Sequence, residues 1–511
     1  MSRKIPPARL AVFSSLLIFA LIASCPVYAA TSATVAWPGQ SGNPVGYAAY
    51  GPLGTTRWPG GSFTSGTTAN PTVYTGYVFT GALTISGQNI IFVSCDFVSG
   101  TSGVTVSGSN ITFIGSRFQS NQVQYYNVNT TGTNITFLYD SFTPLVSLVA
   151  SPPGEVWPSA GAGQNTLVMT NNVNATDGNS GYEFGVNING GGPITIDHCD
   201  FWGFGNAIVF NNPTSTQMIV TSNWIHDAAN ISPQGYHTDG PGYLNGGAGP
   251  SNILVQGNTI ASLGNSNGIA FQAATSGYSG INLINNFNSG FGNTVAPGEP
   301  GNAHFSNSSV MFNVWGTDVE NYFEPLYSNS FPSTGNSVWA CNLMSFRSGT
   351  TWTNQDNFSP TSALDGKYWV PSSARYSSTD YNGNTVCAAL TPGSVNFKSQ
   401  QTGTSSTGQT VHLTNAGTGL VTISSIALQT GSQFAISSNT CGSTLAVGSS
   451  CSFVVTFTPT SPGAKQDFVL VTDNSPAPSS PQSVMVIGTA LGAGSGGTAP
   501  NPPTGLAAVV Q

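Results

Sequence analysis

One nine-residue pattern occurs three times between positions 89 and 142: Asn89-Ile-Ile-Phe-Val-Ser-Cys95-Asp-Phe97, Asn110-Ile-Thr-Phe-Ile-Gly-Ser116-Arg-Phe118 and Asn134-Ile-Thr-Phe-Leu-Tyr-Asp140-Ser-Phe142. Within each copy, apolar residues alternate with other residues, which is typical of a short strand and not of a helix. The segments between the copies are rich in Gly, Asn, Ser and Thr and are expected to form turns.

The pattern continues along the chain. Further copies lie at 166–173, 194–201, 218–225 and 253–260, and weaker ones centre on Asn285, Asn321 and Asn342. The key position therefore falls at residues 95, 116, 140, 171, 199, 223, 258, 285, 321 and 342, with spacings of 21 to 36 residues. Repeats of this length indicate a solenoid. We predict an all-β protein whose residues 76–388 form a right-handed parallel β-helix of about ten coils, ~48 Å long.

The residue types at each column explain how such coils stack. The key position carries Cys, Ser, Asp or Asn, which can hydrogen-bond along the axis at an inward-facing corner. Two residues later an apolar column begins at Phe97 and passes through Val173 and Phe287. Cys95 and Cys199 would lie four coils and ~19 Å apart, too far to pair, so we expect buried free thiols.

Two other pairs of cysteines are candidates for disulfides. Cys341 and Cys387 could close the end of the helix, and Cys441 and Cys451 are expected to bridge.

Composition excludes some classes of function. Residues 1–30 have the pattern of an export signal, with Arg3, Lys4 and Arg9 before an apolar stretch of 13 residues. Without that segment 7 basic and 18 acidic residues remain, a balance of −11, which argues against a nucleic-acid partner. An alternative is a lipobox ending at Cys25, which would make the protein an outer-surface lipoprotein and not a simply secreted one. No later segment is apolar enough to span a membrane.

The remaining parts frame the predicted helix. Residues 31–75 would enter and cap it, residues 393–491 have the strand rhythm of a β-sandwich, and residues 492–511 form a Gly/Ser/Pro-rich tail expected to be flexible. The motifs Leu413-Thr-Asn-Ala-Gly and Cys451-Ser-Phe-Val-Val-Thr-Phe-Thr-Pro resemble the immunoglobulin-like "choice-of-anchor D" domains, which are related to ASH/Hydin domains. The resemblance implies an extracellular spacer or anchor.

Candidate catalytic residues cluster between 197 and 240. The segments are Asp197-His198-Cys199-Asp200-Phe201-Trp202, Asn223-Trp224-Ile225-His226-Asp227 and Tyr236-His237-Thr238-Asp239-Gly240. Aligning the coils places His226 beside Trp202 and Ala261, and Asp239 beside Asn206 and Asn267. The 35 residues from Asn223 to Asn258 therefore contain an enlarged loop, and such loops commonly carry function.

The pieces Trp224-Ile-His-Asp227, Tyr236-His-Thr-Asp-Gly240 and Asn252-Ile-Leu-Val-Gln-Gly-Asn-Thr-Ile260 resemble secreted bacterial β-helix proteins of the pectate-lyase-like superfamily. Relatives often carry Ile-Gln where this chain has Pro241-Gly242. The resemblance implies a polysaccharide lyase or glycoside hydrolase.

For elimination, His226 or His237 would be the base, and Asp200, Asp227 and Asp239 could bind calcium. Hydrolysis would instead use Glu183, Asp200, Asp227 or Asp239 as acid and base. Trp202 and Trp224 could stack on sugars, with Glu183 nearby.

Other interpretations remain open. The protein could bind carbohydrate as an adhesin without catalysis, the histidines could be purely structural, or His226, His237 and Asp239 could hold zinc. The expected partner is a polysaccharide, and we expect a monomer.

Overall fold

The computed structural model of the chain describes residues 31–33, 45–100, 103–120, 126–144, 182–202, 204–211, 217–226, 239–243, 249–261, 269–271, 278–284, 286–289, 305–306, 308–311, 314–315, 338–340, 343–344, 368–370, 388–415, 417, 419–475 and 480–492. The predicted export signal, Cys25, Asp227, His237, Cys341, Cys387 and most of the predicted tail lie outside these residues.

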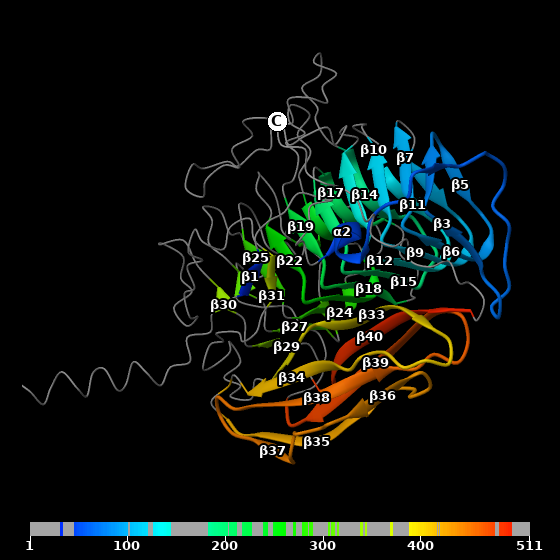
Figure 1. Cartoon of the computed structure of the whole chain (residues 1–511). Coiled ribbons are helices and arrows are strands. Elements are labelled where there is room, and N and C mark those ends of the chain that lie inside the picture. The colour runs from blue at the N-terminus through cyan, green and yellow to red at the C-terminus, as the bar shows by residue number, and fades with distance from the viewer. Residues whose placement is uncertain are drawn as a thin grey trace, which may run out of the picture.

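Three parallel sheets form a β-helix, and from β3 to β23 each coil visits them in the same order (Figure 1). Sheet 1 contains β3 (Thr72–Thr75), β6 (Gln88–Val93), β9 (Ser109–Ile114), β12 (Thr133–Leu138), β15 (Ile194–Asp197), β18 (Met218–Thr221), β21 (Ser251–Gln256), β24 (Tyr278–Ile284), β27 (Ser309–Met311) and β29 (Val338–Ala340), with β26 (Phe305–Ser306) beside β24.

Sheet 2 contains β2 (Thr56–Arg57), β4 (Tyr77–Thr80), β7 (Asp96–Gly100), β10 (Arg117–Ser120), β13 (Ser141–Pro144), β16 (Asp200–Trp202), β19 (Trp224–His226), β22 (Thr259–Ala261), β25 (Phe287–Ser289), β28 (Val314–Trp315) and β30 (Leu343–Met344). Sheet 3 contains β5 (Leu83–Ile85), β8 (Val104–Val106), β11 (Tyr126–Thr130), β14 (Tyr182–Ile188), β17 (Phe204–Phe210), β20 (Asp239–Tyr243) and β23 (Ala270–Phe271). The predicted parallel β-helix is thus confirmed.

The core is a stack of aromatic rings. Phe97 lies 4.7 Å from Phe118, Phe118 lies 5.1 Å from Phe142, and Phe142 lies 4.4 Å from Phe201, all ring to ring and nearly parallel. These separations match the ~4.8 Å between neighbouring strands, so identical residues at one register position stack coil upon coil. The predicted apolar column is confirmed for these positions.

The turn from sheet 1 to sheet 2 carries the predicted polar ladder. Asn223 Oδ1 accepts the N–H of Cys199 at 2.7 Å, and Asn258 Oδ1 accepts the N–H of Asn223 at 2.9 Å. Asn286 Oδ1 accepts the N–H of Asn258 at 3.0 Å. The ladder satisfies backbone donors that the turn would otherwise bury without a partner.

Three predicted positions of this ladder are wrong. Strand β27 pairs directly with β29, and β28 with β30, so no coil centred on Asn321 lies between these strands. Strand β12 pairs directly with β15, and β13 with β16, so no coil centred on Asn171 lies between Asp140 and Cys199. The ladder also uses Asn286 and not the neighbouring Asn285. Cys95 and Cys199 are therefore three coils apart, ~14 Å; both are buried free cysteines, as predicted.

The C-terminal domain is a sandwich of two sheets. One contains β32 (Ala388–Thr391), β34 (Gln409–Asn415), β38 (Ser450–Phe457) and β36 (Phe434–Ser437). The other contains β33 (Ser394–Gln401), β40 (Gln482–Leu491), β39 (Gly463–Asp473), β35 (Val421–Leu428) and β37 (Thr444–Leu445). Strand β32 belongs to the sandwich although it precedes the predicted start at residue 393.

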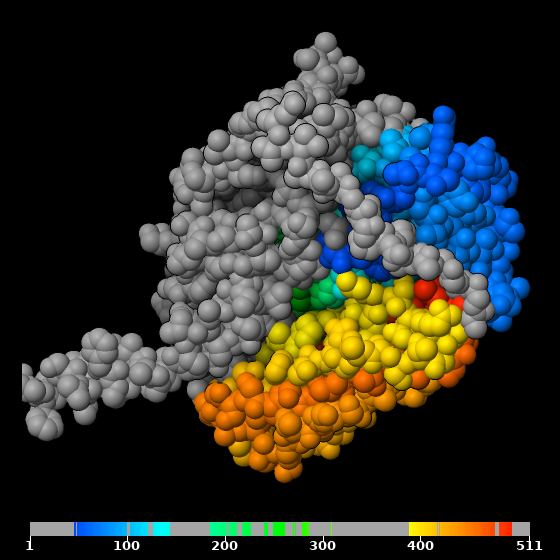
Figure 2. Space-filling view, viewed as in Figure 1, coloured from blue at the N-terminus to red at the C-terminus, as the bar shows by residue number. Residues whose placement is uncertain are grey.

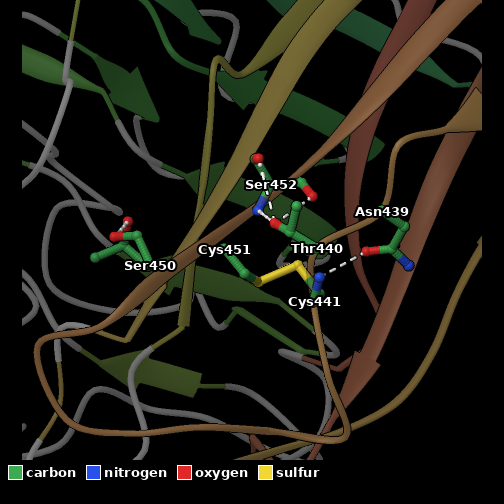
Figure 3. Close-up of a disulfide and its surroundings, with 7 residues drawn as sticks. Asn439, Thr440, Cys441, Ser450, Cys451 and Ser452 are labelled. Atoms are coloured by element: carbon green, nitrogen blue, oxygen red, sulfur yellow. Dashed lines mark hydrogen bonds between the residues drawn. A yellow bond between two sulfur atoms is a disulfide. The ribbon is translucent and has the colours of Figure 1, made fainter.

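The predicted disulfide between Cys441 and Cys451 is present (Figure 3). Beside it, Thr440 N–H donates to the carbonyl of Ser452 at 2.8 Å, and Asn439 Oδ1 accepts the N–H of Cys441 at 2.8 Å. The bridge therefore fastens the segment after β36 to β38, and closing a loop of this size contributes about 3 kcal/mol in the chain-entropy account.

The sandwich packs side-on against the β-helix, over the outward face of sheet 1 (Figures 1 and 2). One apolar cluster joins the two domains; its members are Ile91, Ile114, Leu138, Tyr139, Ile219 and Leu254 from the helix and Phe468, Met485 and Ile487 from the sandwich. The short helix α2 (Gly46–Tyr50) lies where sheet 2, the ladder turn and the sandwich meet. A separate pair of strands, β1 (Thr31–Ala33) and β31 (Tyr368–Val370), is antiparallel.

Candidate functional site

Four of the predicted site residues lie around one loop between sheets 2 and 3. Strand β19 ends at His226 and strand β20 begins at Asp239. Asp227 and His237 belong to the connecting residues 227–238, outside the described residues. The chain order therefore brings all four to the corner where sheet 2 leads into sheet 3.

Strand pairing confirms the predicted register at this corner. His226 pairs with Trp202 of the preceding coil and with Ala261 of the following coil. Asp239 pairs with Asn206, while the predicted neighbour Asn267 lies outside the described residues. Paired residues on adjacent strands are ~4.8 Å apart, so the backbones of the predicted site residues form two short rows.

Glu183 lies at the same corner. It is the second residue of β14, which pairs with β17, which in turn pairs with β20. The backbones of Glu183 and Asp239 are thus two strands apart, about 10 Å, and offset by one register position.

Two of the predicted residues are buried. Asp200 has no exposed surface, and a Cβ placed on Gly46 of α2 would lie 2.8 Å from its Cβ. The indole of Trp224 is 1% exposed. A sugar would reach either side chain only after the residues covering it moved. The roles of Asp200 in calcium binding and of Trp224 in sugar stacking stay predictions, and burial counts against both.

Asn206 was not singled out from the sequence. It is 4% exposed, and its Oδ1 is buried without a hydrogen-bond partner. Its strand partner is Asp239. An unsatisfied buried amide oxygen costs ~1–3 kcal/mol, and Asn206 Oδ1 is one of several such atoms among the described residues, together with Asn127 Oδ1 and Gln256 Oε1. The only sequence signal was its alignment with Asp239.

The Asp197-His198 part of the predicted cluster lies elsewhere. Asp197 is at the end of β15 and has no exposed surface; its carboxylate accepts from Thr221 Oγ1 at 2.7 Å and, from the sandwich, from Ser394 Oγ at 2.6 Å and Asn396 Nδ2 at 2.8 Å. His198 Nδ1 lies 2.9 Å from Asp197 Oδ2. This pair therefore belongs to the contact between the domains. It lies at the corner from sheet 1 to sheet 2, whereas His226 and Asp239 lie at the corner from sheet 2 to sheet 3.

Burial alone would raise the pKa of Asp197. The charge of His198 and the hydrogen bonds from His198, Ser394 and Thr221 outweigh burial, so the pKa lies below its usual value. The ionised carboxylate of Asp197 accepts hydrogen bonds from donors of both domains, so its role is structural.

The outward face of sheet 3 carries a row of uncharged polar side chains. Thr84 pairs with Thr105, Thr105 with Asn129, and Asn129 with Asn187. Asn187 Nδ2 donates to Asn129 Oδ1 at 3.1 Å, and Asn211 Nδ2 donates to Asn187 Oδ1 at 3.0 Å. We call these five side chains the sheet 3 strip. The row ends at Asn211, directly after β17, whereas Asn206 lies near the start of that strand.

Positive charge is scarce and already engaged in the described part of the chain. Arg117 binds Asp96 through Nε at 3.0 Å and Nη2 at 2.7 Å, Lys398 donates to the carbonyl of Ala49, and Lys465 donates to that of Pro462. The fourth described cation, Arg57, is exposed in β2 of sheet 2. None of the four lies on sheet 3.

The described residues contain no group of three His, Cys, Asp or Glu side chains able to hold a metal ion. They also include no helix with the length and apolar character needed to cross a bilayer.

The structures of known proteins that resemble this chain match about a fifth of it. The chain matches no protein-family model and no curated protein. Among solved structures, the ASH/PapD-like domain 7 of human CEP192 is 19% identical over 21% of this chain and 86% of that domain, with a TM-score of 0.16. The C. elegans MSP family member WR4 is 11% identical over 21% of this chain and 99% of its own, with a TM-score of 0.15.

The secreted serine protease VesC from Vibrio cholerae is 18% identical over 21% of this chain and 23% of the protease, with a TM-score of 0.17. The strand topology alone makes the protein all-β, a parallel β-helix followed by a two-sheet β-sandwich.

Proposed function

We propose that the protein is an exported polysaccharide-active β-helix protein of the pectate-lyase-like superfamily, with its sugar site at the corner between sheets 2 and 3. The observation that carries this proposal is the strand register, in which His226 and Asp239 bracket one loop while Trp202 and Asn206 lie beside them. A rigid coil below an enlarged loop is the usual setting for a binding or catalytic site.

The other faces of the helix are occupied. The sandwich covers the outward face of sheet 1 through the apolar cluster that includes Leu138 and Met485. Helix α2 covers part of sheet 2, where the N–H of Tyr47 donates to Ser141 Oγ at 3.2 Å. On the outward face of sheet 3, Thr84 is exposed and Thr105 and Asn129 are half-buried, whereas Asn187 is 5% exposed and holds Asn129 by a hydrogen bond.

The sheet 3 strip suits a neutral polysaccharide. Amide and hydroxyl groups exchange hydrogen bonds with sugar hydroxyls, and those of Thr105, Asn129 and Asn187 repeat at the ~4.8 Å strand spacing. A uronate chain would need cations to neutralise its carboxylates, and the four described Lys and Arg residues lie off this sheet. We therefore favour a neutral over an acidic substrate.

The residues at the corner allow two reactions. Elimination requires a uronate, the acidic substrate that we favour less, and His226 or His237 would be its general base because histidine as a residue type titrates near neutrality. Hydrolysis would instead take its acid and its base from among Glu183, Asp227 and Asp239. Asp227 and Asp239 are the oxygen donors that calcium would use, while Asp200 is buried beneath Gly46.

The test is a screen of the mature protein against a panel of neutral and acidic polysaccharides, with and without calcium. Ultraviolet absorbance detects the unsaturated product of elimination, and reducing ends without that absorbance detect hydrolysis. Activity lost in His237→Ala but kept in His412→Ala, a histidine exposed on β34 of the sandwich, supports the proposal. Activity equal in both variants would remove the site from this corner.

A second candidate is carbohydrate binding without catalysis. The observation that favours it is the sheet 3 strip, which offers hydrogen bonds but no titratable group. Binding of a polysaccharide that is weakened by Asn187→Ala, with no product from any substrate, would decide for an adhesin-like protein.

The remaining assignments follow from the predicted export signal and the sandwich. We assign the protein to the cell exterior, either released or held by a lipid on Cys25. The sandwich is assigned to the choice-of-anchor D group.

A further inference from the structure

Strand β33 of the sandwich contains an irregularity where it faces the β-helix. Its pairing with β40 shifts register between Asn396 and Ser399. Within the bulge Lys398 has φ of 55°, a left-handed conformation uncommon for a residue other than glycine. Bulges of this kind redirect side chains, and local backbone strain persists only where surrounding contacts enforce it.

The polar side chains of the bulge reach across the domain boundary. Asn396 Nδ2 donates to Asp197 Oδ2 of β15 at 2.8 Å. Lys398 Nζ donates to the carbonyl of Ala49 in α2 at 2.8 Å and lies 4.9 Å from the ring centre of Tyr139. The hydroxyls of Ser399 and Tyr50 share a hydrogen bond of 2.8 Å.

Contacts on either side of the bulge extend the same interface. Ser394 Oγ bonds both Asp197 and the hydroxyl of Ser222, the latter at 2.7 Å. Gln256 Nε2 donates to the carbonyl of Ser483 at 3.0 Å, and Thr195 Oγ1 donates to Gln466 Oε1 at 3.1 Å. The polar contacts therefore span three consecutive coils, from β15 through β18 to β21.

We propose that the β33 bulge is a latch that fixes the sandwich to the β-helix and to α2, so that the two domains unfold as one unit. The sandwich then braces the central coils and is not a freely moving spacer. The latch joins parts of the chain about 350 residues apart, since Ala49 and Tyr50 contact Lys398 and Ser399 with sequence separations of 349. This inference does not depend on the proposed function.

The variant Asn396→Ala/Lys398→Gly/Ser399→Ala tests the latch in the full mature chain. Glycine at 398 removes the Nζ contacts while relaxing the left-handed backbone, so the sandwich itself keeps its fold. Calorimetry should show one unfolding transition for the wild type and two for the variant, and small-angle scattering should show a larger radius of gyration. The matched control is Lys465→Ala, because Lys465 bonds only its own domain through Pro462; one transition is expected.

Either of two results would overturn the latch: two transitions in the wild type, or one transition in the triple variant at an unchanged midpoint. Should the triple variant fail to fold, the milder pair Tyr50→Phe and Ser399→Ala decides. The double variant should lower the midpoint no more than the larger of the single changes, because both remove one shared hydrogen bond. Strictly additive shifts would contradict the contact.

Discussion

Two corners of the same β-helix follow opposite rules. The corner from sheet 1 to sheet 2 takes two residues in coil after coil, a left-handed residue such as Tyr139, His198 or Ser222 followed by a ladder residue. The corner from sheet 2 to sheet 3 ranges from one residue, 203, to the 37 residues 145–181. The comparison teaches that the ladder sets the coil geometry and leaves the chain free to insert loops elsewhere.

Removing a ladder residue should have the largest effect. Asn223→Ala deletes the acceptor for the Cys199 N–H and the donors to the carbonyl of Ile196 and to Asn258. Since these groups are buried, we expect a loss of about 3 kcal/mol in the free energy of unfolding. Denaturant titration measures it.

The matched control is Asn129→Ala on the outward face of sheet 3, where one hydrogen bond, to Asn187, is lost. We expect it to cost less than about 1 kcal/mol. Equal losses of unfolding free energy in the two variants would mean that the ladder contributes no more to stability than the outward face of sheet 3.

At the variable corner a substitution should change activity and not stability. His237→Ala should lower the turnover of a substrate found by the polysaccharide screen by about 100-fold, the usual contribution of a general base. Its melting temperature should stay within about 1 °C of the wild type, because the ladder carries the coil. A large fall in melting temperature would instead make this histidine structural.

Asp197 sharpens the comparison because it lies just before the regular corner but faces the sandwich. Its pKa is lowered, so its ionised form stabilises the fold above the unfolded value near 3.8, and that stabilisation is lost as pH falls through the folded pKa. The melting temperature of Asp197→Asn should lie well below that of the wild type at pH 6 and approach it near pH 2.5. A gap that does not narrow on acidification would contradict this role.

Asp140 should show a dependence on pH with the opposite sign to that of Asp197. It lies inside the ladder, where complete burial outweighs its hydrogen bonds from Ser116 and Leu138 and holds the pKa well above the usual range. Its stabilisation is complete below the unfolded pKa and declines as pH rises through the folded one. Relative to the wild type, Asp140→Asn should therefore gain stability in thermal melts as the pH rises above 4, and the gain should level off above the folded pKa of Asp140.

The sequence was sufficient to predict the coils, the ladder and the register at the candidate site. It failed at Asn171 because the stretch 166–173 alternates apolar and polar residues as a true coil does. Since the spacing between coils varies, spacing alone could not exclude this stretch as a coil. It chose Asn285 over Asn286 because two adjacent asparagines fit the pattern equally. Alignment placed Asp239 beside Asn206, but only burial shows that the Asn206 oxygen lacks a partner.

The docking of the sandwich was missed although a signal was present. Strands of sheet 1 carry apolar residues on both faces, as in Ile90-Ile91-Phe92 and Phe137-Leu138. A strand that is apolar on both faces belongs to a sheet covered on both sides. The sequence did not show what covers the second face, because the contacts involve residues more than 200 positions away, such as Gln466 and Ser483.

The side-on attachment of the sandwich has a mechanical consequence. A solenoid pulled from its last coil yields one coil at a time, since each coil is held only by its neighbours. Here β40, the last strand in the described part of the chain, lies in the sandwich sheet that packs on the middle coils. Tension on the C-terminal end therefore loads many bonds at once in shear. The force that the β-helix withstands is then set by the contacts of its middle coils with the sandwich, and not by the contacts of its last coil.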